Sequence, residues 1–154
     1  MNVIYEKNVF NNVKKVTWDD LIEKISLEYD ENTCTTVLSS LTAISSKESN
    51  KSPTIVCHNS YLPGTLLNAF NEVSTNKKVR DMHIYTSFSK NADTYARHND
   101  NVDVLIVQAI GKTSYLFDDG KEYTLSPGDS IFIPKGVYHT PRILEPRVTL
   151  SFGI

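Results

Sequence analysis

The pattern of apolar and polar positions predicts a helix near the start of the chain, in TWDDLIEKISLEYD. Thr17 is suited to be its N-cap, with Asp20 three residues further on in the first turn. A weaker helical pattern, PGTLLNAFNEV, begins just after Pro63. In the first stretch, the apolar residues recur with the helical period, at Trp18, Leu21, Ile22, Ile25 and Tyr29.

From Met82 onward, the pattern changes to short runs rich in β-branched and aromatic residues. So many strands in so little chain leave no room for crossover helices, so the sheet must be antiparallel, as a sandwich or barrel. Asp119-Gly120 and the Pro127-Gly128 turn separate three of the runs. The seven predicted strands are MHIYTSF, VDVLIVQAI, KTSYLF, KEYTL, SIFIP, VYHT and RVTLSF.

Composition narrows the class of protein only a little. The chain has 154 residues, 40% of them hydrophobic and 22% charged, and its net charge of −2 does not favour nucleic acid as a partner. Cys34 and Cys57 do not form a CxxC pair, which favours a reducing compartment. We find neither a signal peptide nor an apolar run long enough to cross a bilayer, so we expect a cytoplasmic protein without a membrane partner.

Candidate chemistry lies in ARHNDNVD and in PGDSIFIPKGVYHTP. On a strand, His98 and Asp100 would project from the same face, because alternate residues do. His139, which follows a Pro-x-Gly corner, could add a third ligand from a neighbouring strand. Two imidazoles and one carboxylate are the usual ligand set of non-haem Fe(II) that activates O₂. The alternative is that these are ordinary packed or exposed side chains, since an H-x-D triplet also arises by chance.

Two motifs resemble those of a known family. The segment G-x5-P-x-G-x2-H, through Gly128, Pro134, Gly136 and His139, resembles the second motif of the cupin superfamily. The closing RVTLSFGI also looks like the last strand of that barrel. The preceding segment is similar to the metal-binding stretch of the JmjC-like cupins, which are Fe(II)/2-oxoglutarate oxygenases. Its matching positions are His98, Asp100, Gln108, Gly111, Lys112 and Tyr115.

The resemblance covers roughly residues 82–154 and implies a mainly β, double-stranded β-helix (jelly-roll) with one or two N-terminal helices. We expect one domain over 1–154, with 1–81 as helical and strand support and 82–154 as the metal-binding barrel core. Ordinary metal cupins read H-x-H followed by a Glu, whereas this chain has Asp100 and then apolar residues such as Val104. This difference favours the oxygenase branch, with His98, Asp100 and His139 as metal ligands.

The position at which the family usually anchors the distal carboxylate of 2-oxoglutarate with a Lys or Arg is Thr113 here. Thr113 and Tyr115 would share a strand face and could donate hydroxyl hydrogen bonds. Arg147 could supply the cation from the last strand, because RVT is similar to the R-x-S or R-x-T setting of some other 2-oxoglutarate oxygenases. The alternative is that Arg147 is a surface residue beside Glu145. Lys112 is expected to be solvated.

The leading hypothesis is a hydroxylase that uses Fe(II), 2-oxoglutarate and O₂. Nickel, zinc or cobalt could replace the iron during purification, because such sites bind later first-row ions more tightly. The alternatives are a non-catalytic cupin module that holds a metal or ligand, favoured by Thr113, and a cupin enzyme that needs no keto acid. The family's substrates include protein side chains, RNA bases and small molecules, and its members commonly form homodimers.

Overall fold

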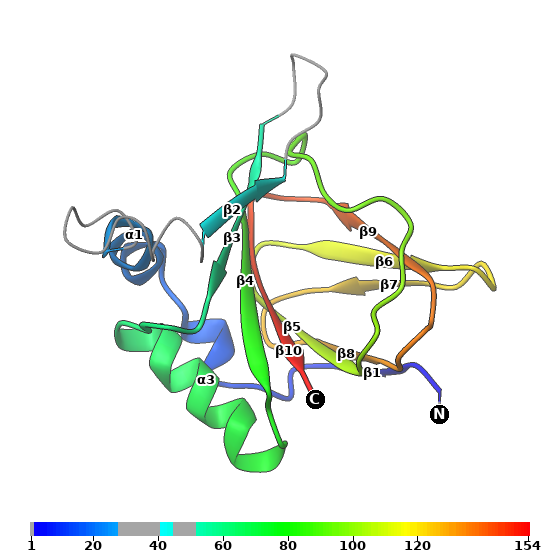
Figure 1. Cartoon of the computed structure of the whole chain (residues 1–154), viewed down its shortest axis with the longest axis horizontal. Coiled ribbons are helices and arrows are strands. Elements are labelled where there is room, and N and C mark those ends of the chain that lie inside the picture. The colour runs from blue at the N-terminus through cyan, green and yellow to red at the C-terminus, as the bar shows by residue number, and fades with distance from the viewer. Residues whose placement is uncertain (1, 28–40, 45–51) are drawn as a thin grey trace.

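The computed structural model describes residues 2–27, 41–44 and 52–154 (Figure 1). In this part of the chain there are two α-helices, α1 (Trp18–Leu27) and α3 (Gly64–Asn76), and a short 3₁₀ helix, η1 (Val13–Lys15). Neither helix is long and apolar enough to cross a membrane. The strands are β1 (Ile4–Glu6), β2 (Leu41–Ile44), β3 (Thr54–His58), β4 (Asp81–Ser87), β5 (Val104–Ile110), β6 (Thr113–Phe117), β7 (Glu122–Leu125), β8 (Ser130–Ile133), β9 (His139–Ile143) and β10 (Arg147–Gly153).

The strands form two antiparallel sheets. A seven-stranded sheet has the order β1-β8-β5-β10-β4-β3-β2, and a three-stranded sheet has the order β7-β6-β9. Figure 1 shows the smaller sheet facing the β8-β5-β10-β4 part of the larger one, with the helices on the other side of the large sheet. The predicted mainly β jelly-roll with N-terminal helices is therefore confirmed, and all seven strands expected after Met82 are present.

The strand pattern did not predict β1, β2 and β3. These strands come from the first 58 residues and extend the large sheet at both edges, with β1 beside β8 and β3 beside β4. The N-terminal part of the chain therefore contributes strands to the large sheet as well as helices.

Local signals set the two helices. The backbone N–H of Asp20 donates to Thr17 Oγ1 over 3.2 Å, which confirms the predicted N-cap of α1. The Asp20 carboxylate accepts a 2.8 Å hydrogen bond from the backbone N–H of Thr65, which joins α1 to the first turn of α3. The second helix begins at Gly64, directly after Pro63, as expected. Tyr29 and Cys34 lie outside the described residues.

The turn residues also behave as predicted. Gly120 has φ +82° and closes the hairpin between β6 and β7, where Phe117 and Lys121 pair over 2.9 Å. Gly128 has φ +91° in a turn whose first carbonyl, on Ser126, accepts from the N–H of Asp129 over 2.9 Å. These turns set the register of the strands that enclose the barrel.

Alternation along the strands divides the core into two layers. Even-numbered residues of β10 such as Leu150 and Phe152 face the helices, whereas Arg147 and Thr149 face the barrel interior. The layer under the helices includes Val13, Leu21, Leu66, Ala69, Val73, Met82, Ile84, Val107, Val148, Leu150 and Phe152. The apolar layer between the sheets comprises Val104, Ile106, Tyr115, Phe117, Leu125, Ile131 and Ile133.

Candidate metal centre

The H-x-D motif lies in the loop between β4 and β5 (residues 88–103), so its expected placement on a strand is wrong. A single antiparallel bridge holds this loop against the start of β9, with N–H to carbonyl distances of 3.0 and 2.8 Å between His98 and His139. The carbonyl of Asp100 also accepts a 2.9 Å hydrogen bond from Gly136. These backbone hydrogen bonds therefore hold the loop with His98 and Asp100 against the Pro-x-Gly corner and His139.

The three side chains predicted as metal ligands lie together. One ligand atom from each of His98, Asp100 and His139 lies within 4.8 Å of the other two. Asp100 Oδ2 is 3.7 Å from His139 Nε2, and the two imidazole ring centres are 4.4 Å apart. His139 is 2% exposed, whereas the side chain of Asp100 is 34% exposed, so one side of the cluster is open to solvent. The spacing is compatible with three ligands of one ion.

Backbone contacts select the tautomer of both histidines. The Nδ1 atoms of His98 and His139 lie 2.8 and 3.1 Å from the carbonyl oxygens of Ala96 and Val137. A carbonyl only accepts, so in each ring Nδ1 carries the proton and Nε2 keeps its lone pair for an ion. Burial lowers the pKa of His139, and the neighbouring His98 lowers it further. The hydrogen bond to Val137 and the charge of Asp100 act in the opposite direction but do not outweigh burial. His139 is therefore in the neutral form that binds metals.

A buried arginine lies in the same pocket. Arg147, the first residue of β10, is 2% exposed, which excludes the alternative that it is a surface residue beside Glu145. Glu145 instead pairs with Lys112 over 3.1 Å, and both side chains are about half exposed, as expected for Lys112. Arg147 donates to Ser87 Oγ over 3.2 Å and to Thr149 Oγ1 over 3.3 Å.

These partners of Arg147 are neutral. Within residues 2–27, 41–44 and 52–154, no carboxylate forms an ion pair with this guanidinium. Burial lowers the pKa of Arg147, with Tyr115 and Tyr85 acting against it, but a guanidinium is still a cation at neutral pH. A buried cation that has only hydroxyl partners is suited to bind an anion that enters the pocket.

The other two residues predicted to bind the cosubstrate differ in their placement. Tyr115 lines the pocket, and burial raises the pKa of its hydroxyl, which is therefore a neutral donor. Thr113 instead donates to Gln108 Oε1 over 2.8 Å, and the same oxygen accepts a 2.9 Å hydrogen bond from Thr149. Thr113 thus supports the surroundings of Arg147 through Gln108 and Thr149.

Pattern analysis did not single out several residues of the pocket wall. Tyr85 on β4 is the main one: burial raises the pKa of its phenol, and its ring lies 5.7 Å from the Arg147 guanidinium carbon. The only signal available was its alternation with His83 and Ser87 along a predicted strand. The residues that line the pocket are Tyr85, Thr94, Tyr95, His98, Asp100, Ile106, Tyr115, His139, Pro141, Arg147 and Ser151.

Comparisons with known proteins give a fold but no family. No protein-family model matches the sequence, and no curated protein matches it. The structure is similar to that of YcfD, a ribosomal oxygenase from Escherichia coli, solved with cobalt and 2-oxoglutarate, with a TM-score of 0.70 and 17% identity over 99% of this chain. The complex of YcfD with cobalt and succinic acid gives a TM-score of 0.69 and 17% identity over 98% of this chain.

This chain spans only 47% of the YcfD chain. A cupin superfamily protein from Desulfitobacterium hafniense aligns with 12% identity over 70% of this chain and 82% of its own, but its TM-score of 0.49 is too low to support an argument. The resemblance inferred from the two motifs is therefore confirmed as a likeness of fold, and it extends well beyond residues 82–154.

Proposed function

We propose that this chain is the metal-binding barrel of an Fe(II)- and 2-oxoglutarate-dependent oxygenase. The observation that carries the proposal is the presence of two complementary features in one pocket: a His-Asp-His cluster, and a buried arginine without a carboxylate partner among the described residues. An anionic keto acid could use both features, because its keto-acid end chelates a metal and its distal carboxylate needs a cation.

The chemistry of the donor atoms fits a ferrous ion. His98, Asp100 and His139 would hold it through two neutral Nε2 atoms and one carboxylate, which leaves coordination positions free for other ligands. Bound there, the ion would supply the activation of O₂. The same N/O donor set accepts cobalt, nickel or zinc, so a substituted ion is expected after purification.

The other end of the pocket fits the distal carboxylate of 2-oxoglutarate. Arg147 would supply the charge, and the neutral phenol of Tyr115 would supply a further hydrogen-bond donor. Ser87 and Thr149 accept hydrogen bonds from the guanidinium and hold it in place. Cobalt and 2-oxoglutarate are present in one structure of YcfD, and cobalt and succinic acid in another, which supports the choice of cosubstrate.

Two keto acids test the proposal directly. The full chain is loaded with Mn(II), which occupies such a site without consuming O₂, and titrated with 2-oxoglutarate and with 2-oxobutyrate in a calorimeter. The two compounds share the keto-acid group, but only 2-oxoglutarate has the distal carboxylate. We expect 2-oxoglutarate to bind about 100-fold more tightly, since an unpaired buried cation is costly. His98→Ala should abolish binding of both, whereas His58→Ala, a histidine outside the cluster, should not.

Turnover gives the second readout. With Fe(II), O₂ and ascorbate as the reductant, the protein should convert 2-oxoglutarate into succinate and CO₂, slowly in the absence of the primary substrate, with one oxygen atom of O₂ going into succinate and the other being reduced to water. Metal binding without any preference for 2-oxoglutarate and without succinate would indicate a non-catalytic metal-binding module, or a cupin enzyme that needs no keto acid. Failure to bind any divalent metal would contradict the proposal as a whole.

A further inference from the structure

An exposed arginine connects the β4–β5 loop to the opposite sheet. Arg97 Nε and Nη2 lie 2.8 and 2.6 Å from the two carboxylate oxygens of Asp118, at the tip of the β6–β7 hairpin. The guanidinium carbon also lies 4.0 Å above the centre of the Tyr138 ring. This combination of a bidentate ion pair and a cation–π contact is here called the Arg97 clasp.

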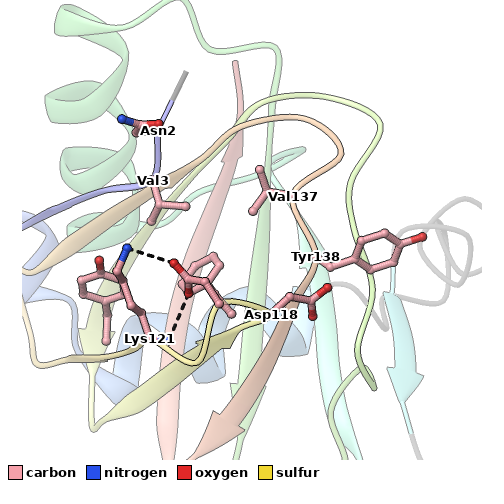
Figure 2. A pocket seen from close by; sticks show the side chains of 9 residues that line it. Asn2, Val3, Asp118, Lys121, Val137 and Tyr138 are labelled. Atoms are coloured by element: carbon pink, nitrogen blue, oxygen red, sulfur yellow. Dashed lines mark hydrogen bonds and ion pairs between the residues drawn. The ribbon is translucent and has the colours of Figure 1, made fainter.

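The clasp joins three segments that are far apart in sequence. Arg97 belongs to the loop that carries His98 and Asp100, Asp118 belongs to the hairpin, and Tyr138 directly precedes His139. Asp118 and Tyr138 line an open groove of about 500 Å³, and Phe117 and Val137 also line it. Figure 2 shows Asp118, Val137 and Tyr138 around this groove. The clasp therefore fixes the loop to the wall of this groove, next to two of the proposed metal ligands.

The position of Arg97 affects the orientation of the His98 imidazole. His98 Nδ1 donates to the carbonyl of Ala96, so the orientation of the imidazole depends on the backbone on both sides of Arg97. The backbone of His98 itself is held by the antiparallel bridge to His139. Tyr138 directly precedes β9, and consecutive residues of an extended chain point to opposite sides, so Tyr138 contacts Arg97 while His139 points toward the ligand cluster.

We propose that Arg97 is a positioning residue for the metal centre: its clasp on Asp118 and Tyr138 holds residues 96–98 in the conformation that aims His98 Nε2 at the ion. This inference rests on the proposed metal site. Without the clasp, the loop would become ordered only when the metal binds, and the conformational entropy lost in that step would weaken binding. A preformed loop avoids this cost.

A second ion pair at the same hairpin provides a matched control. Lys121 Nζ lies 2.9 Å from Asp119 Oδ2, and both side chains are exposed to a similar degree as those of Arg97 and Asp118 (Figure 2). Among the described residues, the side chains of Lys121 and Asp119 form no ion pair or hydrogen bond with the β4–β5 loop. Removing this pair takes away a similar surface interaction without affecting the backbone around His98.

The experiment compares Arg97→Ala, Asp118→Ala, the double variant and Lys121→Ala in the full chain, with Co(II) as the probe. Calorimetry gives the Co(II) dissociation constant, and the visible spectrum of bound Co(II) reports the ligand geometry. We expect Arg97→Ala and Asp118→Ala each to weaken Co(II) binding about fivefold, the double variant to weaken it no further, and Lys121→Ala to have no effect. The Co(II) spectrum should change only in the variants that lack the clasp.

Hydrogen exchange of the metal-free protein gives a readout that does not depend on metal. Amides of residues 96–100 should exchange faster in Arg97→Ala than in Lys121→Ala. If the parent protein binds Co(II) but Arg97→Ala and Lys121→Ala are alike in affinity, spectrum and exchange, the role of Arg97 is overturned and the metal centre stands. If the parent protein binds no Co(II), the proposed function fails and the role of Arg97 fails with it.

Discussion

The interior of the barrel has an apolar half and a polar half, and the same strands contribute to both. On β5, Ile106 belongs to the apolar layer between the sheets, and Gln108, two residues further on, belongs to the polar network around Arg147. On β6, Phe117 packs in the apolar layer, whereas Thr113 donates to Gln108. The direction of these side chains is the same, and only their chemistry changes along the strand.

The apolar half of the barrel stabilises the fold, whereas the polar half lowers stability and needs another explanation. Burying apolar side chains stabilises the fold by about 25 cal/mol for each Å² removed from water. Burying a guanidinium without a carboxylate has the opposite effect, with a penalty of several kcal/mol before compensation by hydrogen bonds. Nothing in the packing requires Arg147, Gln108 and Thr149 at positions where aliphatic side chains would fill the barrel. The polar half therefore supports the proposal that the pocket binds an anionic ligand.

The largest expected effect is the loss of metal affinity on substitution of Asp100, at the solvent-exposed side of the ligand cluster. Asp100→Ala removes the only proposed ligand that carries a charge, and it should weaken Co(II) binding by more than about 100-fold, because loss of a group that only supports a ligand already costs about 10–100-fold. Asp100 is partly exposed, so folding should be unaffected. Calorimetry measures the change, with Asp119→Ala as the control carboxylate. Equal affinity of the two variants would remove Asp100 from the ligand set.

A substitution in the apolar half should affect stability without affecting binding. Ile131 is fully buried between the sheets, and Ile131→Ala should lower the free energy of unfolding by about 3 kcal/mol, since it leaves a cavity. Urea denaturation measures this loss. Under conditions where the variant is folded, its affinity for Co(II) should equal that of the parent protein. A large loss of affinity in the folded variant would show that the two halves are coupled.

In contrast to Ile131→Ala, Arg147→Met should affect ligand binding without lowering stability. The substitution replaces a buried cation by an apolar side chain of similar length, so the free energy of unfolding should stay the same or increase. The preference of the Mn(II)-loaded protein for 2-oxoglutarate over 2-oxobutyrate, about 100-fold in the parent, should disappear. Lys112→Met, at the half-exposed lysine that pairs with Glu145, serves as the control and should keep the preference. Retention of the preference in Arg147→Met would exclude Arg147 as the carboxylate anchor.

The smallest effect is expected in the support of Arg147. Thr149→Val keeps the shape of the side chain but removes the hydroxyl that accepts from Arg147 and donates to Gln108. The affinity for 2-oxoglutarate should fall about fivefold through the loss of these hydrogen bonds. The same titration in the Mn(II)-loaded protein measures it. No change in affinity would show that Ser87 alone is sufficient to hold the guanidinium.

Much of the fold could be predicted because its signals are local. The N-cap at Thr17, the helix after Pro63, the glycine turns and seven strands depend on residues within a few positions of one another. The strands β1 and β3 escaped prediction: Ile4–Glu6 has only three residues, and both strands are stabilised by pairing with β8 and β4, which are distant in sequence. The assignment of 1–154 as one domain stays a prediction.

The sequence by itself determined which side chains were available for chemistry: the H-x-D motif, His139 after its corner, and the alternation that placed Thr113 and Tyr115 on one face. Only the tertiary structure decided what these residues do together. It buried Arg147 away from Glu145, turned Thr113 toward Gln108 and brought Tyr85 into the pocket. The physical reason is that burial and charge pairing depend on neighbours across the sheets, and local sequence patterns carry no information about those neighbours.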